Sequence, residues 1–198
     1  MTLRFRRLVL AQILLLSTVG AAEASLIING DFATDLSGWG NLGVPGTQWT
    51  AGEAWLGVPG ANGTSTLNQS FNLASGADAV SLVFDYNFVG PGASSPPDVF
   101  SVLFSYTDIF ANSQIVTAFM LDDSSAPVSG TYSNSTALNN IDTTAPVTLS
   151  FVLFESNQGA GTRVELDNVS AEAVPEPATL ALFGLGVAGL GWSRRKKA

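Results

Sequence analysis

The stretch AVSLVFDYNFV, residues 79–89, shows the alternation on which the fold class depends. Every second residue from Val80 onward is apolar or aromatic, whereas Ser81, Asp85 and Asn87 occupy most positions between them. A period of two residues is typical of a strand with one buried face and one exposed face. This stretch therefore predicts a half-buried β-strand.

Similar runs lie on both sides of this stretch. They span 98–107, 114–121, 146–155 and 162–171, with weaker candidates at 26–28, 48–57 and 67–73. Segments rich in Gly, Pro, Ser and Asn separate the runs, and no internal stretch has a helical period of useful length. About eight short strands joined by such loops predict an all-β domain, a single antiparallel β-sandwich of the jelly-roll type.

The N-terminus, residues 1–24, has the composition of a secretory signal peptide. Three arginines within the first seven residues precede an apolar run over 8–19, and Ala22-Glu23-Ala24 fits a small-x-small cleavage site. The sequence thus predicts export, a signal helix and processing by signal peptidase. The alternative, a buried N-terminal helix, would place three arginines at the positive end of the helix dipole.

The charge of the chain is concentrated at its ends. Between the signal and the last 25 residues, 25–173, Arg163 is the only basic residue against fourteen acidic ones, a net charge of −13. Such a body repels phosphate backbones and anionic lipid, so no nucleic-acid partner is expected. The same charge favours binding of divalent cations.

Histidine and cysteine are both absent from the sequence. Zinc sites built on these residues and catalysis by Ser-His-Asp or Cys-His groups are therefore excluded. An exported chain without disulfides must be stabilised by its core or by a metal. The roughly 150 residues of 25–173 suffice for one domain with a sizeable core.

Two motifs stand at opposite ends of the body: LIINGDFATDLSGW (26–39) and RVELDNVSA (163–171). Their combination resembles the galactose-binding-like jelly rolls, which include many carbohydrate-binding modules. The resemblance implies neighbouring first and last strands with a structural Ca²⁺ between them. Asp167 matches the acidic position of the last strand, and Asp31 is the candidate in the first motif, where Ala33 replaces the usual acid. The alternative is that both aspartates bond backbone donors in turns.

Trp49 and Trp55, in TQWTAGEAWLG (47–57), are the candidate ligand-binding residues because an indole stacks on the apolar face of a sugar ring. Their separation of six residues places them on one face of a continuous strand. Packing in a core explains the same spacing. Trp39, in the Gly-Trp of the first motif, is expected in the core.

Carboxylate catalysis is the remaining enzymatic possibility, because glycoside hydrolysis requires two acidic groups across a cleft. Glu53, between the two tryptophans, is the candidate. Asp122-Asp123 lies in a Ser- and Pro-rich segment and is expected to be a solvated turn. No motif supports catalysis, so no catalytic residue is assigned.

The C-terminus, VPEPATLALFGLGVAGLGWSRRKKA (174–198), has three parts. Pro175, Glu176 and Pro177 precede an apolar run, 178–192, and the chain ends with a basic cluster: Arg194, Arg195, Lys196 and Lys197. As a helix the run is about 22 Å long, against a hydrocarbon core of roughly 30 Å. Cations that reach the interface allow such a short helix to insert.

These three parts resemble the PEP-CTERM sorting domain of Gram-negative bacteria. The resemblance implies transient insertion in the inner membrane, recognition by an exosortase, removal of the helix, and delivery to the cell surface or extracellular matrix of bacteria that make exopolysaccharide. An ordinary C-terminal anchor is the alternative. We therefore expect a non-catalytic adhesive or structural protein of the surface or biofilm matrix that binds exopolysaccharide. A surface glycan hydrolase or lyase and a ligand-free matrix protein are the other hypotheses.

Overall fold

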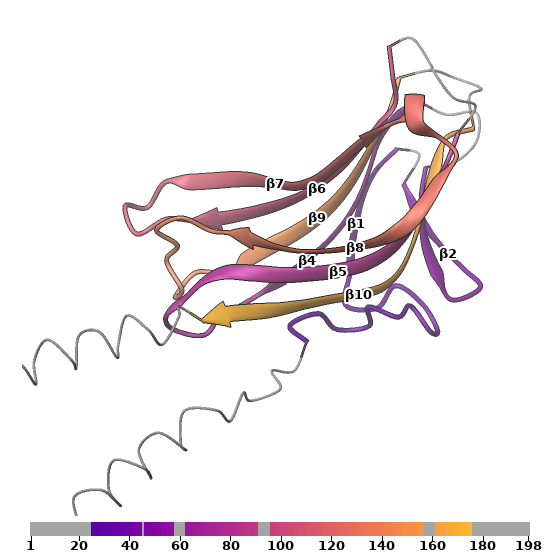
Figure 1. Cartoon of the computed structure of the whole chain (residues 1–198). Coiled ribbons are helices and arrows are strands. Elements are labelled where there is room, and N and C mark those ends of the chain that lie inside the picture. The colour runs from indigo at the N-terminus through magenta and orange to yellow at the C-terminus, as the bar shows by residue number, and fades with distance from the viewer. Residues whose placement is uncertain (1–24, 45, 58–61, 91–95, 157–160, 176–198) are drawn as a thin grey trace, which may run out of the picture.

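The central strand β5 (Ala77–Val89) shows how the alternating pattern builds the core. Val80, Phe84 and Phe88 are fully buried, whereas Asp85 remains partly exposed on the opposite face. Removing each large apolar side chain from water contributes about 1.5–3 kcal/mol, so the strand must be covered on that face. A second sheet provides the cover (Figure 1).

The computed structural model describes residues 25–44, 46–57, 62–90, 96–156 and 161–175. One sheet has the strand order β1-β4-β9-β6-β7 and the other β2-β3-β10-β5-β8. The other strands are β1 (Gly40–Val44), β2 (Thr47–Thr50), β3 (Glu53–Leu56), β4 (Gly63–Phe71), β6 (Val99–Thr107), β7 (Ser113–Asp122), β8 (Val128–Ala137), β9 (Val147–Glu155) and β10 (Arg163–Pro175). All their pairings are antiparallel. A short 3₁₀ helix, η2 (Asp123–Ser125), precedes β8.

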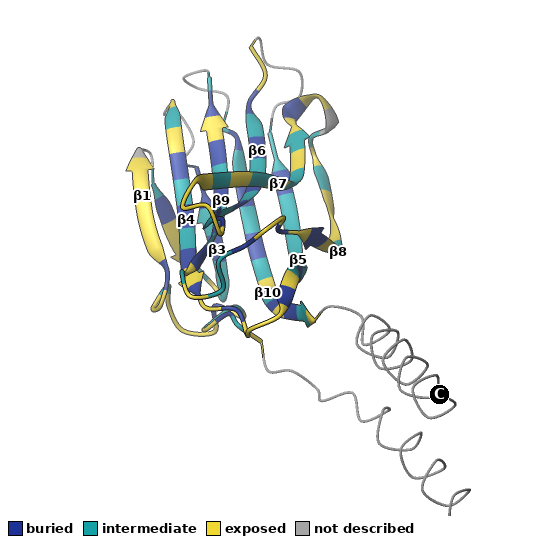
Figure 2. Ribbon diagram, turned by 90° about the vertical axis from the view of Figure 1, so that its left-hand side faces the viewer, coloured by how far each residue is buried: buried dark blue, intermediate teal, exposed yellow. Residues whose placement is uncertain are grey.

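Aromatic rings join the two sheets across the core. Phe151 of β9 lies edge-on to Phe84 of β5, with ring centroids 5.2 Å apart, and stacks on Phe100 of β6 at 6.4 Å. Trp39 is 6.0 Å from Phe151 and is 8% exposed, as expected for a core residue. Figure 2 shows the resulting alternation of buried and partly exposed positions along β4, β9 and β10.

The N-terminal segment, 25–39, lies beside β10 and β4 and joins the two sheets along this side. Backbone bonds of 2.7 Å and 2.8 Å connect Leu26 to Ala171 and Val169 to Gly30. The side-chain amide of Gln69 in β4 accepts a hydrogen bond from the Ile28 N–H and donates one to the Ile28 carbonyl. The weak strand expected at 26–28 is wrong, because these bonds continue no ladder.

The predicted all-β jelly-roll sandwich is confirmed. The described residues form ten strands instead of about eight, because 48–57 is a hairpin and because β1 and β8 add edge strands. The expected signal helix and C-terminal helix lie outside the described residues. The final strand, β10, continues to Pro175, so it includes the start of the tail expected from residue 174. Among the described residues, no helix has the length and apolar character needed to cross a membrane.

Candidate functional site

Neighbouring strands of the second sheet bring polar side chains into one row on its outer face. Trp55 of β3 is paired with Glu165 of β10, which is paired with Asn87 of β5. The row extends to Gln48 of β2 and Ser129 of β8. Residues directly opposite each other in antiparallel strands point to the same side. Segments far apart in the sequence thus share one surface.

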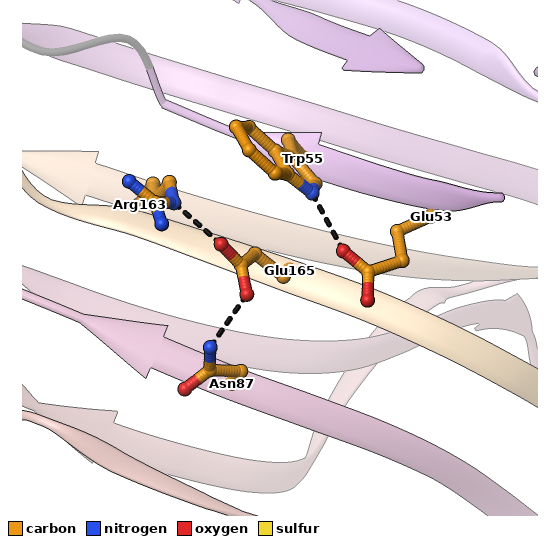
Figure 3. Close-up of polar contacts among 5 residues, drawn as sticks. All are labelled: Glu53, Trp55, Asn87, Arg163 and Glu165. Atoms are coloured by element: carbon orange, nitrogen blue, oxygen red, sulfur yellow. Dashed lines mark hydrogen bonds and ion pairs between the residues drawn. The ribbon is translucent and has the colours of Figure 1, made fainter. Parts of the chain in front are cut away.

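Direct contacts connect the centre of this row (Figure 3). The Arg163 Nε donates to Glu165 Oε1 at 2.6 Å, and Asn87 Nδ2 donates to Glu165 Oε2 at 2.5 Å. The Arg163 guanidinium carbon lies 4.6 Å from the ring centroid of Trp55, a cation–π contact, while the indole N–H donates to Glu53 at 2.9 Å. Together these contacts fix the positions of the indole and the guanidinium.

A hollow of about 170 Å³ lies beside the row. Its lining residues are Glu53, Asp85, Tyr86, Asn87, Glu165, Leu166 and Asp167. Asp85 accepts hydrogen bonds from Thr131 Oγ1 at 2.5 Å and Asn168 Nδ2 at 2.9 Å. These bonds favour the ionised form and lower the pKa of Asp85 below its usual range. The hollow therefore contains carboxylate acceptors suited to hydroxyl and amide donors.

Asp167 has the opposite electrostatics. Burial raises its pKa, and the negative charges of Glu53, Asp85 and Asp31 raise it further, although the Asn168 N–H opposes this effect. Asp167 is paired with Asp85 and lies on the same face of β10 as Glu165, and the register of β10 shifts directly after it, between Asp167 and Ser170. Asn168 there has a φ of 51°, which Asn tolerates better than most residues. The regular pairing of Asp167 with Asp85 therefore places two carboxyl groups next to each other on the outer face.

The two candidate tryptophans do not share a face, and the expectation that they do is wrong. A turn at Ala51-Gly52, with φ values of 53° and 93°, folds the segment into the β2–β3 hairpin. Trp49 pairs with the buried Ala54, whereas Trp55 pairs with Gln48. The side chain of Trp49 is 42% exposed and its indole N–H donates to the Phe32 carbonyl at 2.6 Å. Trp49 therefore supports the N-terminal segment, and Trp55 belongs to the polar row.

The candidate metal residues, Asp31 and Asp167, lie on adjoining segments, because Gly30 is bonded to Val169. The charge of Asp31 contributes to the raised pKa of Asp167. Asp31 also accepts a long 3.4 Å bond from the Ala33 N–H. Within the described part of the chain, no group of three or more acidic side chains is arranged to hold a metal ion.

A second acidic cluster lies at the end of the sandwich where β9 ends and β10 begins. Asp98, Asp123 and Glu155 are all buried there, so the solvated turn expected at Asp122-Asp123 is wrong for Asp123. Asp98 accepts from the Ser156 N–H at 2.6 Å and from Thr162 Oγ1 at 2.5 Å. Burial and the charge of Asp98 raise the pKa of Glu155 to about 7.

Comparison with protein families identifies the motif at the C-terminal end of the chain. Residues 173–196 match the PEP-CTERM protein-sorting motif. This is an exported protein with a PEP-CTERM sorting signal. The motif begins within β10, whose last residue, Pro175, is paired with Ala77. Glu176, Pro177 and the basic cluster lie outside the described residues.

Solved structures resemble the body of this chain, which precedes the sorting motif, in fold. TmCBM61 in complex with β-1,4-galactotriose has a TM-score of 0.53 and 11% identity over 77% of this chain and 100% of its own. The N-terminal cellulose-binding domain of Cellulomonas fimi β-1,4-glucanase C has a TM-score of 0.52 and 14% identity over 78% and 100%.

Part of an enzymatically active domain also has this fold. The active domain of bacteriophage CBA120 tailspike protein 4 has a TM-score of 0.52 and 12% identity over 76% of this chain, which spans only 21% of it. A search of curated proteins found no match to this chain. At such identities the likeness establishes the sandwich fold, and function must be argued from the residues.

The sequence analysis named Trp55 as a ligand-binding candidate, Asp167 as a metal candidate and Glu53 as the candidate for catalysis. It did not name Arg163 or Asn87 as site residues, which lie at the same row and hollow. A signal for both was present, since each lies at an outward position of an alternating strand. Their partnership through Glu165 depends on the pairing of β5 with β10, which lie 78 residues apart at this contact.

Proposed function

We propose that this exported protein is a non-catalytic surface or matrix component that binds polysaccharide across the outer face of the β2-β3-β10-β5-β8 sheet. The observation that carries the proposal is the row formed by Trp55, Arg163, Glu165 and Asn87 beside an open hollow. An indole offers a flat apolar surface, and the neighbouring polar groups offer donors and acceptors for sugar hydroxyls. Binding of this kind requires no group outside the chain.

The comparisons support this proposal at the level of fold. TmCBM61 was solved with β-1,4-galactotriose, and the domain from Cellulomonas fimi is a cellulose-binding domain. Both sandwiches are covered completely by this chain. A sandwich of this type exposes a broad sheet surface, and here that surface contains the polar row.

Glycan-array binding of the purified protein tests the proposal. We expect binding to one or more polysaccharides without release of reducing ends. Absence of binding to every glycan, at a protein concentration where the fold is intact by circular dichroism, would favour the ligand-free matrix protein. Exopolysaccharide purified from the producing cell belongs on the array, because it is the ligand the sorting route would make available.

A glycan hydrolase or lyase is the second candidate function. One observation favours it: Asp167, whose pKa is raised by burial, lines the same hollow as Glu53, so two carboxyl groups face one space. The tailspike domain of similar fold is described as enzymatically active. Shortening of a bound polysaccharide, lost in Asp167→Asn and Glu53→Gln, would replace the binding proposal with this one.

Calcium remains part of the proposal as a structural ion near Asp31 and Asp167. The two carboxylates lie on neighbouring segments, and backbone carbonyls of the N-terminal motif would complete the oxygen ligands that Ca²⁺ requires. A melt in Ca²⁺ and in chelator tests this directly. A ligand at 100 times its Kd stabilises by about 2.7 kcal/mol. Identical melting temperatures would exclude the ion.

The sorting signal is proposed to act through an exosortase after signal peptidase has removed 1–24. The chain would insert its apolar run, 178–192, in the inner membrane, and cleavage near Pro175-Glu176-Pro177 would release the domain to the surface. Intact-mass measurement of protein extracted from the cell surface distinguishes the outcomes. A mass that includes the basic cluster would favour a permanent anchor.

A further inference from the structure

Two large apolar side chains project into solvent from the turn between β6 and β7. Ile109 and Phe110 are 61% and 70% exposed and adjacent in sequence. Burying one such side chain contributes about 1.5–3 kcal/mol, so a pair displayed on a loop needs an explanation. We call residues 109 and 110 the apolar tip.

The turn that displays this tip is internally braced. Asp108 is 6% exposed, and its Oδ1 accepts from the backbone N–H groups of Phe110 and Asn112, both at 2.9 Å. Its Oδ2 accepts from Gln114 Nε2 at 2.9 Å. These bonds lower the pKa of Asp108, so it stays ionised and bonded. The tip therefore cannot turn inward without breaking a charge-assisted network.

The tip lies at the end of the sandwich from which the chain leaves the fold (Figure 1). The Ile109 N–H donates to the Asn140 carbonyl at 2.8 Å. The adjoining Leu138 N–H donates to the Asp78 carbonyl at 2.7 Å, next to Ala77, the partner of Pro175. Backbone contacts thus connect the tip to the last described residue of the chain.

The apolar run of the sorting tail begins almost immediately after this point. Only Glu176 and Pro177 separate Pro175 from the run 178–192. Two residues span at most about 7 Å. When the run is in a membrane, Pro175 must therefore lie within about a nanometre of the lipid surface, and the tip lies at the same end of the sandwich.

We propose that Ile109 and Phe110 insert into the interfacial layer of the bilayer while the sorting tail is in the membrane. This inference rests on the proposed membrane passage of the tail and is independent of glycan binding. The domain is then held at two places, the tail and the tip, instead of rotating about the tail alone. The polar row around Glu165 lies ten residues along β10 from Pro175, about 30 Å from the lipid. The sugar-facing sheet stays clear of the membrane during processing.

The chain contains no cysteine, which allows a clean labelling test. Phe110→Cys, Ser75→Cys and Ala188→Cys, each labelled with a polarity-sensitive fluorophore, are reconstituted as full chains in phosphatidylcholine vesicles. Ser75 is exposed at the same end, in the turn before β5, and has no large apolar neighbour in sequence. Position 188 reports insertion of the tail. We expect quenching by shallow spin-labelled lipid at 110 at least threefold stronger than at 75.

The test separates insertion from mere proximity and from labelling artefacts. Adding Ile109→Ser to the Phe110→Cys chain should at least halve the quenching, because it removes the one apolar side chain of the tip that the label has not replaced. Equal quenching at 75 and 110, or quenching at 188 alone, would overturn the proposal. No quenching at any position would overturn it together with the proposed membrane passage, while glycan binding stays intact. A signal at 110 that rises with protein concentration without vesicles would assign the tip to a second copy.

Discussion

The two outer faces of the sandwich have the same geometry and different chemistry. Across one sheet, paired positions place Leu42, Thr66, Val152, Ser101 and Met120 in a row without charge. Across the other, the corresponding row contains Trp55, Glu165 and Asn87, with Arg163 held over the indole. Only the second face places charged, hydrogen-bonding and aromatic groups in contact with one another.

This difference shows that polar outward residues are not enough to make a site. In the described strands of the first sheet, the only charged residues are Asp122 and Glu155, and Glu155 points inward. The other outward positions of this sheet hold uncharged residues, among them serine, threonine and exposed apolar side chains such as Met120 and Phe154. On the second sheet, the outward groups bond one another around an open hollow, which is the property expected of a binding surface.

Both outer faces depend on one core that the two sheets share. Removing the Phe151 ring should therefore destabilise both sheets together. Phe151 is fully buried and contacts rings from three other segments: Phe84, Phe100 and Trp39. Phe151→Ala should lower the free energy of unfolding by about 3–5 kcal/mol. Chemical denaturation measures this change in unfolding free energy. Phe154→Ala, which removes an exposed ring from the same strand, is the matched control. A loss below 1 kcal/mol would show that the sheets do not depend on this contact.

The second largest effect should come from the buried carboxyl of the first sheet. Glu155 is 2% exposed, its Oε2 has no hydrogen-bond partner among the described residues, and burial beside Asp98 raises its pKa to about 7. The folded state therefore holds this proton more tightly than the unfolded chain. The resulting stabilisation is complete below pH about 4.5 and is lost as the pH rises through 7.

The lost stability is on the order of 3 kcal/mol for a shift of this size. Glu155→Gln should therefore raise stability relative to the native chain at pH 8 and not at pH 4. Urea denaturation of both proteins at the two pH values gives the difference, in which contributions from Asp167 and the other carboxylates cancel. A difference that does not change with pH would mean that Glu155 titrates normally.

The fold was predictable where burial repeats locally. β5, β6 and β9 each bury every second residue over most of their length, so a short window of sequence contains the information. β8 was missed because its residues are mostly exposed on both faces, as an edge strand permits, and no alternation results. The β2–β3 hairpin was missed because Ala51 takes a left-handed conformation that usually requires Gly or Asn.

The site was predictable only in part, because it depends on register. Trp55 and Asp167 were visible as residue types, but their neighbours come from strands joined by long connections. Asn87 and Glu165 meet because β5 and β10 pair in one particular register, and the shift after Asp167 cannot be read from composition. A change of one residue in that pairing would send each side chain to the opposite face. Local patterns therefore indicated a polar face without indicating its contacts.

Removing one aromatic ring from each outer face tests the comparison itself. Trp55→Ala should weaken glycan binding at least tenfold, about 1.4 kcal/mol, because the indole is the aromatic surface of the polar row. Phe154→Ala removes a ring that is 47% exposed on the opposite face and should leave binding unchanged. Titration calorimetry against the best array ligand measures both. Equal losses of affinity in the two variants would mean that the glycan does not bind the face with the polar row in preference to the other.

Trp49→Ala sharpens the same test within one hairpin. Its indole bonds the Phe32 carbonyl and lies on the other side of β2 from Gln48 in the polar row. We expect reduced stability with unchanged affinity, the reverse of Trp55→Ala. A loss of binding at Trp49 with an unchanged melt would restore the hypothesis that both tryptophans contact sugar.

The smallest effect concerns the ion pair that positions Arg163. Glu165 accepts from Arg163 and Asn87 with its two oxygens, and Arg163 is 29% exposed in its side chain. A partly exposed pair of this kind contributes about 0–1 kcal/mol to stability. Glu165→Gln keeps the shape and loses the charge, and its amide can accept only one of the two bonds. The unfolding free energy should therefore change by less than about 1 kcal/mol, while affinity falls by about threefold because the guanidinium is no longer held over Trp55.

Glu172→Gln, an exposed glutamate on the same strand outside the row, provides the matched control and should alter neither quantity. If Glu165→Gln and Glu172→Gln bind glycan with the same affinity, the Glu165 ion pair does not contribute to binding. The difference in glycan binding between the two faces would then depend on Trp55 alone.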